Sequence, residues 1–476
     1  MEGITYQELK TNLPALQQLD EMKIVQKQNE HATLYISGIC YESAKDALVT
    51  EMLEGKDIEL YSEKKGKTIL FKGLIQKSKV TFHGGIYMLE LWGISYSYLT
   101  DVCKKSASYQ DTGETYKSIF RKLIKQYQGG DVKDLATKDK ATGKLLVQYE
   151  ETDWEFMKRL ASHFNAALYP NVTLAGPKLY LGTPAGANRG EVTCHKYKIS
   201  KDILSYKRAA GNTNPFLKEM DVMCYKVKVL DNFEIGDKVT YQRKSLCVKS
   251  KTATLENGMV RFAYELCSEN GMTVEQIVNE RLTGLSIRGT VLECVKDKVK
   301  VHLVIDPTQE KGKAYEFPYS TVYTAEGQSG WYCMPEEGDT VLVNFPSHDE
   351  AGAVAINSYR QGSQSDKISD PKTKYFRTAN GKELKFSPEE IVITCIQGKD
   401  PKTGENKTVY IRLNQNNGVE IMSSEPIAFT TDKGISLTAE DKIEITAKNE
   451  LTLHCKKSQI KMDTKVDICG PDVRIN

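Results

Sequence analysis

Pairs of apolar residues recur along residues 418–476 with a step of eight. The two members of each pair are two residues apart, so both side chains leave the same face of a short strand. Such a strand exposes an apolar stripe and unpaired backbone groups, and something must cover them. The pairs are Val419/Ile421, Ile427/Phe429, Ile435/Leu437, Ile443/Ile445 and Leu451/Leu453, then the less regular Ile460/Met462, Val466/Ile468 and Val473/Ile475.

Three copies of the repeat wound around a common axis would turn these stripes inward and remove the free edges. The pattern therefore favours intertwined strands from three identical chains, and an antiparallel meander inside one chain is the alternative. The core positions predicted for the trimer are Ile435, Leu437, Ile443, Ile445, Leu451 and Leu453.

Alternating apolar residues predict a β-rich first domain over residues 1–285, with strands concentrated in 20–100 and 179–267. Two helices interrupt it, at about 112–128 and 153–165. The first has apolar residues at helical spacing, and the second starts at a capping box, Thr152-x-x-Glu155. A short helix is also expected over Thr273–Leu282.

Five short strands are predicted within residues 286–360, which suits a small closed barrel such as an OB-fold. A polar run over 361–374 reads as a linker. Residues 375–413 then supply strand pairs, one of them joined by the hairpin dipeptide Asn380-Gly381, and the terminal repeat completes the segment 375–476. The predicted fold is mainly β with a few helices.

The composition argues against several classes of function. Sixty-five Lys and Arg residues balance 63 Asp and Glu residues, so no strong global field attracts nucleic acid. Eleven cysteines, with no Cys-x-x-Cys, fit reduced thiols and synthesis in the cytosol. The N-terminus has neither the basic nor the apolar region of a signal peptide, and no apolar run approaches a membrane span, so we expect no Sec export and no stable membrane insertion.

Candidate chemistry is sparse, because the common hydrolase, nucleotide-binding and metalloprotease motifs do not occur. Cys194-His195 would face opposite sides of a strand, which disfavours a nucleophile and base. His348-Asp349-Glu350 is expected on a solvated loop. Glu150, Glu151 and Asp153 could imitate the paired carboxylates of a glycosidase, but their place beside a capping box favours helix-terminus electrostatics.

Three segments resemble the VgrG and phage tail-spike family of contractile injection systems, and the resemblance covers nearly the whole chain. Residues 146–160 are similar to the hub motif, in which an acidic strand end leads into a helix with Trp and Phe. Residues 330–345 are similar to the barrel signature, here Trp331, Pro335 and the pair Gly338-Asp339. Residues 468–476 resemble the terminal β-helix turn.

The resemblance implies a homotrimeric spike. Its hub (1–285, with β-barrel domains) would cap the inner tube, its OB-fold (286–360) would form a collar, and its β-helix needle (375–476) would pierce the target envelope. The implied partners are the inner tube protein, baseplate proteins, effector cargo and a PAAR-like tip protein. The tip would bind the apex formed by Pro471, Val473, Ile475 and Asn476.

The resemblance implies no catalytic residue, no cofactor and no metal. Some phage spikes bind iron through His-x-His near the tip, whereas the terminal region here holds only His454. The resemblance also implies that the protein is assembled in the cytoplasm and then becomes part of a tail-like particle, which is released or delivered into a target envelope. Two alternatives remain open: a tail-associated peptidoglycan hydrolase without a recognisable motif, and a secreted adhesin with a trimeric stalk.

Overall fold

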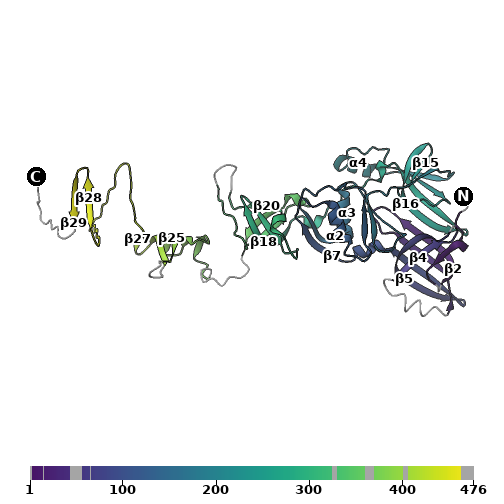
Figure 1. The fold of residues 1–476 in the computed structure, drawn as a ribbon, viewed down its shortest axis with the longest axis horizontal. Coiled ribbons are helices and arrows are strands. Elements are labelled where there is room, and N and C mark those ends of the chain that lie inside the picture. The colour runs from purple at the N-terminus through teal and green to yellow at the C-terminus, as the bar shows by residue number, and fades with distance from the viewer. Residues whose placement is uncertain are drawn as a thin grey trace. The chain divides into compact units, whose positions relative to one another are not determined.

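The computed structural model describes residues 3–13, 16–42, 56–64, 66–323, 330–359, 369–399 and 406–462. The chain divides into two compact units, residues 1–362 and 363–476, and each is described here by itself. Within the described residues of both units, strands far outnumber helices (Figure 1).

Twelve strands of the described chain form one sheet in the first unit. Residues 9–95 supply one half and residues 188–267 the other, and the halves join where β2 pairs with β16, with Gln26 opposite Lys251. The largest hydrophobic core of the unit lies against this sheet. The strands are β1 (Leu9–Thr11), β2 (Leu16–Gln26), β3 (Thr33–Cys40), β4 (Asp57–Ser62), β5 (Thr68–His83), β6 (Ile86–Ser95), β12 (Asn188–Glu191), β13 (Tyr197–Lys201), β14 (Met223–Val229), β15 (Lys238–Tyr241), β16 (Lys244–Glu256) and β17 (Met259–Cys267).

A second layer carries two of the helices, α2 (Tyr116–Ile124) and α3 (Asp153–Ser162). The two predicted helices are therefore present but shorter than expected. Their apolar faces pack together in a core of their own. Around them lie β7 (Lys104–Tyr109), which pairs with β9 (Leu146–Thr152), and a small sheet of β8 (Asp131–Asp134), β10 (Leu168–Pro170) and β11 (Lys178–Leu181).

The capping box predicted at the start of α3 is confirmed. The Thr152 side chain accepts from the Glu155 amide, and the Glu155 carboxylate accepts from the Thr152 amide. The helix predicted over Thr273–Leu282 is wrong except for the 3₁₀ turn η5 (Glu280–Leu282). Sequence reasoning also missed α4 (Ile203–Asn212), because this helix buries only Ala209 and so shows no apolar stripe.

Short 3₁₀ turns connect several of these elements. They are η1 (Tyr6–Glu8), η3 (Tyr96–Asp101), η4 (Asn270–Met272), η6 (Lys311–Lys313) and η7 (Glu350–Gly352).

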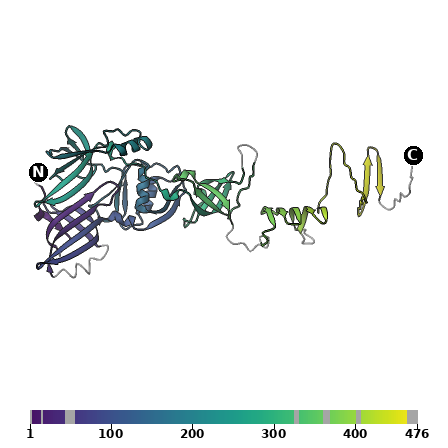
Figure 2. The same cartoon turned by 180° about the vertical axis from the view of Figure 1, so that it is seen from behind.

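The predicted five-stranded barrel is confirmed within 285–358. The strands close in the order β18-β19-β20-β22-β21 around a core of alternating side chains such as Val291, Val299 and Val343. Figure 2 shows the barrel beside the helical layer of the same unit. Its strands are β18 (Leu285–Val295), β19 (Lys298–Leu303), β20 (Glu316–Ser320), β21 (Thr340–Phe345) and β22 (Val354–Ser358).

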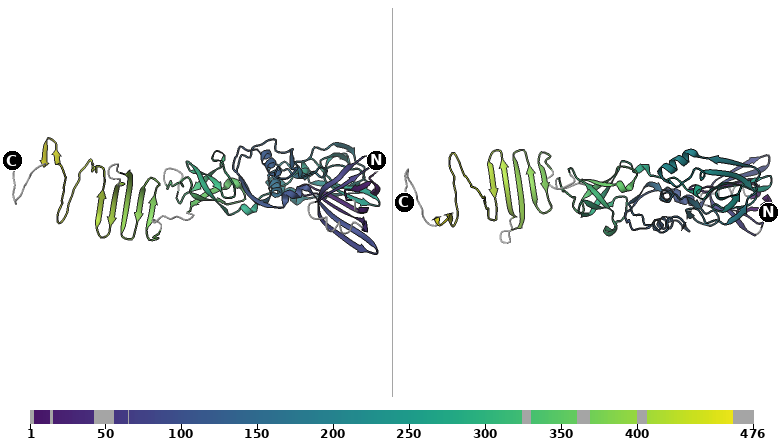
Figure 3. Two further views of the ribbon diagram at one scale, coloured as in Figure 1. Left: turned by 60° about the horizontal axis from the view of Figure 1, so that its bottom comes forward. Right: turned by 90° about the horizontal axis from the view of Figure 1, so that it is seen from above.

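The second unit begins with a five-stranded antiparallel meander, whose strands lie side by side in Figure 3. The predicted Asn380-Gly381 hairpin is present, with Gly381 at φ +73°. Residues 423–450, all of them described, form neither helix nor strand, and a hairpin of β28 and β29 follows. The strands are β23 (Lys374–Arg377), β24 (Lys382–Phe386), β25 (Glu390–Lys399), β26 (Asn406–Asn414), β27 (Gly418–Met422), β28 (Leu451–Cys455) and β29 (Ser458–Met462).

Candidate functional site

Arg159, Glu151 and Glu350 form a buried ion cluster in the first unit. It lies where the helical layer meets the barrel and is called the junction cluster. Arg159, on α3, donates through Nε and Nη2 to the two oxygens of Glu151, at 2.9 and 2.8 Å, and through Nη1 to Glu350 at 2.6 Å. A further Nη2 bond reaches the Val147 carbonyl at 2.7 Å. The three charged side chains are 2%, 6% and 3% exposed, so water contributes little to their solvation.

Local sequence sets this geometry. The chain leaves β9 at Thr152, and the capping box fixes the first turn of α3, so Glu151 ends the strand just before the helix that carries Arg159. Burial alone would lower the pKa of the Arg159 guanidinium, but its bonds to Glu151 and Glu350 raise that pKa. Arg159 therefore stays charged and bridges two carboxylates that are far apart from each other in the sequence.

Glu350 belongs to the barrel, on the turn η7 before β22, so the cluster ties the barrel to the helical layer. The expectation that His348, Asp349 and Glu350 lie on a solvated loop is wrong for Glu350, which is buried against Arg159. His348 and Asp349 are exposed, as expected. The error arose because Arg159 is 191 positions away in sequence and the neighbours of Glu350 are polar.

A second set of bonds joins β7 to the barrel. Asp306, just after β19, accepts from the Ser108 amide at 2.6 Å and from its hydroxyl at 2.5 Å. Gln110 donates to the Val301 carbonyl at 3.1 Å and accepts from the Tyr315 amide at 3.0 Å. Burial raises the pKa of Asp306 more than the Ser108 bonds lower it.

Apolar packing crosses the same boundary. Leu145 and Val147, at the start of β9, are fully buried in the core of the barrel rather than in the core of the helical layer. The helical layer and the barrel are thus joined by side chains of the β9 segment, a buried ion cluster and hydrogen bonds, and together these contacts form one junction within this unit.

The carboxylates that could have imitated a glycosidase pair lie at or beside this junction, and the structure shows what the buried ones bind. Glu151 is bound to Arg159, and Asp153 is fully buried and accepts from Lys105 at 2.6 Å and from the Tyr127 hydroxyl at 2.7 Å. Glu150 is exposed, with φ +48°. The two buried carboxylates therefore stabilise the packing of the helical layer. Helix-terminus electrostatics accounts for only part of their role.

Cys194, the other candidate nucleophile, also has a local hydrogen-bond partner. Cys194 lies in a loop and not in the expected strand, and its thiol donates to the Lys196 carbonyl at 3.0 Å. The neighbouring His195 is exposed.

The barrel signature residues lie in the segment before β21, and Gly338 and Asp339 form the turn into that strand. Gly338 has φ +91°, a conformation that favours glycine, and its amide donates to the Val291 carbonyl at 2.9 Å. The Asp339 carboxylate accepts from the Glu336 amide at 2.9 Å, as expected of a Gly-Asp turn. The Pro335 carbonyl accepts from the Cys294 thiol, while the Trp331 side chain is 61% exposed.

The described residues of the second unit form almost no apolar core. Of its described side chains, Val392 alone is both hydrophobic and buried. The register of the meander explains why: opposed residues share a face, and one face collects most of the large apolar side chains. This apolar face consists of Phe376, Leu384, Phe386, Ile391, Ile393, Ile411, Leu413, Val419 and Ile421.

The opposite face of the meander is charged and internally paired. Glu390 accepts from Lys385 at 2.9 Å and lies 3.3 Å from Arg412, which also pairs with Glu420 at 2.9 Å. The Tyr410 hydroxyl donates to Glu420 at 2.6 Å. The sheet is therefore amphipathic, with ion pairs within the chain on one face and largely exposed apolar side chains on the other.

The predicted needle core behaves in the same way. Its described side chains stay largely outside any core, with Ile435 60%, Leu437 68% and Ile445 61% exposed. Ile443 and Leu453 are exposed and Leu451 is half-buried in the β28–β29 hairpin. The predicted apex of Pro471, Val473, Ile475 and Asn476 lies outside the described residues.

Among the described residues, no cluster of three or more His, Cys, Asp or Glu side chains has the arrangement of a metal site. None of the helices described here has both the length and the apolar character needed to cross a bilayer.

The comparison with known proteins gives the fold its class. No family model and no curated protein matches the sequence. The E. coli c3393 protein, described as a type VI secretion system component with structural similarity to T4 bacteriophage tail proteins gp27 and gp5, matches with a TM-score of 0.54 at 13% identity. That match covers 74% of this chain and 99% of the E. coli chain.

A second match is to the Francisella PdpA-VgrG complex. Its lidded form matches with a TM-score of 0.53 at 8% identity, over 86% of this chain and 76% of that one. The half-lidded form matches with a TM-score of 0.52 at 8% identity, over 85% and 83%. The chain thus has the fold of the VgrG and phage tail hub-spike proteins, as its sequence motifs predicted.

Proposed function

We propose that this chain is a structural hub and spike of a contractile injection system, and that it works as a homotrimer. The observation that carries the proposal is the second unit, in which the described side chains of the apolar face and of the repeat are largely exposed. Exposed apolar surface of this extent marks an interface. The fold shared with VgrG-like proteins supports the same reading.

Threefold assembly suits both parts of the second unit. Three amphipathic meanders can form a closed prism with Ile393, Ile411 and their neighbours inside and the ion pairs of Glu390 and Glu420 in water. Residues 423–450 can then become strands by pairing with other copies, which also removes the free edges. Each copy would supply what the other two lack.

The first unit supplies the base of the proposed device. Its twelve-stranded sheet and helical layer correspond to the hub, which would contact the inner tube and baseplate, and the barrel would form the collar. Axial force on the collar has to reach the hub through the junction. Buried ion pairs and the buried side chains of the β9 segment suit that task because they resist shear in a defined geometry.

The remaining partners follow from the same proposal. A PAAR-like tip would sit on the apex and effector cargo would travel with the spike. The particle would be assembled in the cytoplasm and would then act at the target envelope. This function needs no catalytic residue, and the buried carboxylates Glu151 and Glu350 are already bound by Arg159.

Two substitutions on one strand test the trimer. Leu453 and Thr452 are neighbours on β28 and point to opposite faces, and Thr452 lies opposite Lys461 in the hairpin. Leu453→Asp would bury three carboxylates around the proposed axis, at a cost of several kcal/mol per uncompensated charge. Thr452→Asp adds the same charge next to a lysine and serves as the control.

The readout is solution mass by light scattering. We expect a trimer for wild type and Thr452→Asp, and loss of the trimer for Leu453→Asp. Ile393→Asp should act like Leu453→Asp, because Ile393 lies on the apolar face of the meander. Trimers of normal stability for both Leu453→Asp and Ile393→Asp would refute the inward placement.

A further inference from the structure

Three cysteines lie in a row across neighbouring strands of the twelve-stranded sheet. Cys247 on β16 is directly opposite Cys267 on β17. On the other side of β17, Tyr225 of β14 is opposite Leu266, so the next step of this antiparallel ladder places Cys224 opposite Cys267. Directly opposed residues have Cα atoms about 4.5–5.5 Å apart and share a face, which is within the range that a disulfide spans.

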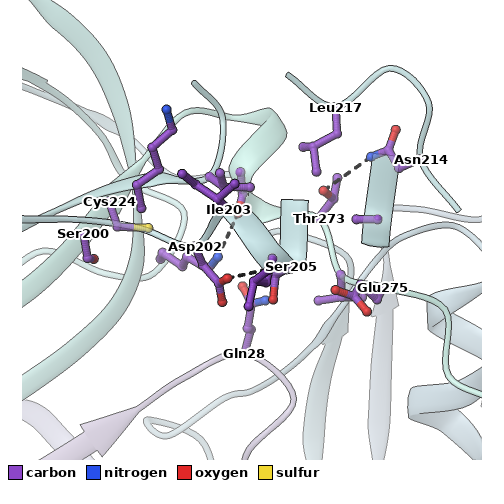
Figure 4. Close-up of a pocket in the computed structure, with 17 residues that line it drawn as sticks. Gln28, Ser200, Asp202, Ile203, Ser205, Asn214, Leu217, Cys224, Thr273 and Glu275 are labelled. Carbon is purple, nitrogen blue, oxygen red and sulfur yellow. Dashed lines mark hydrogen bonds between the residues drawn. The ribbon is translucent and has the colours of Figure 1, made fainter. Parts of the chain in front are cut away.

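The three thiols differ in access. Cys267 is fully buried and Cys247 nearly so, whereas Cys224 is half-buried and lines a cavity of about 700 Å³. The cavity lies between the segment β13–α4 and the strands β14 and β16. Figure 4 shows Cys224 on one wall, with its sulfur directed toward Asp202 and Ile203.

The environment of Cys224 favours its thiolate. Contact with the Cys267 thiol and the charges of Lys249 and Lys226 lower the pKa of Cys224, against burial and the charge of Glu265, whereas contact with Cys224 and burial raise the pKa of Cys267. Burial raises the pKa of Cys247 instead. Cys224 is thus both the accessible thiol and the nucleophilic one, and Cys267 is in contact behind it.

We propose that Cys224 and Cys267 form a thiol–disulfide exchange site that reacts with a small disulfide of the glutathione class. In the first step the Cys224 thiolate attacks one sulfur of the small disulfide, a mixed disulfide forms, and one small thiolate leaves. In the second step Cys267 loses its proton and attacks the Cys224 sulfur, and the second small thiol leaves. Two protein thiols and one small disulfide become one protein disulfide and two small thiols.

The cavity fits a peptide-like disulfide with carboxylates at its ends. Lys201 and Lys249 on its walls offer positive charge, and Gln28, Ser200 and Asn214 offer hydrogen bonds to peptide groups. Lys201 already pairs with Glu219, and Lys249 donates to the Gly271 carbonyl, so both ammonium groups are held in place. Asp202 is occupied as the N-cap of α4, where it accepts from the Ser205 amide.

The product would tie β14 to β17, next to the edge strand β13. The described cysteines are all unpaired in this structure, which is the reduced state. The inference is independent of the proposed trimer, since both strands belong to one chain.

The test exposes full-length protein to oxidised glutathione, blocks the remaining thiols and maps the modified peptides by mass spectrometry. We expect wild type to lose the mass of two hydrogen atoms on one peptide pair, that of Cys224 and Cys267. Cys247→Ser is the matched control, since it removes the other thiol opposite Cys267, and it should give the same crosslink. Cys267→Ser should instead keep a stable glutathione adduct on Cys224.

Two outcomes would overturn the proposal. One is a wild-type crosslink between Cys247 and Cys267, and the other is no change at Cys224 while other thiols react. The wild-type map decides this without any variant, so a folding defect in a variant leaves the test intact. A kinetic readout adds to it: the rate at which the Cys224 thiol of wild type reacts should rise with pH below the range of an ordinary thiol, and Lys249→Gln should move that rise to higher pH.

Discussion

Removing the Arg159 guanidinium tests the junction most sharply. Arg159→Met keeps the aliphatic stem and leaves the carboxylates of Glu151 and Glu350 buried without their cation. Breaking a buried pair by deleting one partner costs about 3–5 kcal/mol, because the remaining charge has neither water nor a partner. We expect a loss of that size here, since both carboxylates are less than one-tenth exposed.

Two further variants serve for comparison, one with a smaller expected loss and one as a surface control. Glu350→Gln keeps an oxygen that accepts from Arg159 and leaves one guanidinium with one carboxylate, so its cost should be only about 1 kcal/mol. Arg261→Met is the surface control, because Arg261 lies 4.0 Å from Glu256 and is 38% exposed. Its effect should stay within about 0.5 kcal/mol.

The assay is urea unfolding at a fixed protein concentration, followed by the fluorescence of the buried Trp154 in α3. The expected order of destabilisation is Arg159→Met, then Glu350→Gln, then Arg261→Met. A loss below about 1 kcal/mol for Arg159→Met, or a larger loss for Glu350→Gln than for Arg159→Met, would refute the reasoning.

Two other predictions concern the first unit. Burial, with help from Lys144 and Arg159, lowers the pKa of His163 to about 3, so the unfolded chain binds more protons than the folded chain between about pH 3 and 6.5. Stability should therefore fall as pH falls through this range, by up to about 1.4 kcal/mol per pH unit from this group. His163→Gln should flatten the slope of the urea midpoint against pH, and an unchanged slope would contradict the assignment. Gly338→Ala should destabilise the barrel by about 1 kcal/mol or more because of φ +91°, whereas Gly312→Ala, equally free of neighbours but without positive φ, should be silent in the same assay.

Local patterns in the sequence predicted a good part of this fold. The alternation of apolar and polar residues within 286–360 was sufficient to predict the barrel, because each strand has one buried face and one solvent-facing face. The Thr152–Glu155 capping box and the Asn380-Gly381 hairpin depend on neighbouring residues only, and both were predicted correctly. The hub-like motif over residues 146–160, which contains Arg159, lies at the junction between the helical layer and the barrel.

Contacts between distant residues could not be predicted in this way. Glu350 looked solvated because its only buried cationic partner in the described chain, Arg159, comes from a different element. α4 was missed because its apolar residues face outward. The Cys224–Cys267 pair depends on the strand order β16-β17-β14, which no short motif encodes.

The central claim is that the second unit obtains its core from other copies of the chain. The most direct measurement is the solution mass, by light scattering, of full-length protein and of a chain that lacks residues 375–476. We predict a trimer for the full-length protein and a loss of trimer stability after truncation, because the apolar face of the meander and the repeat are then gone. A monomeric full-length protein would contradict the account, since the apolar side chains of residues 376–460 would then have nothing to pack against.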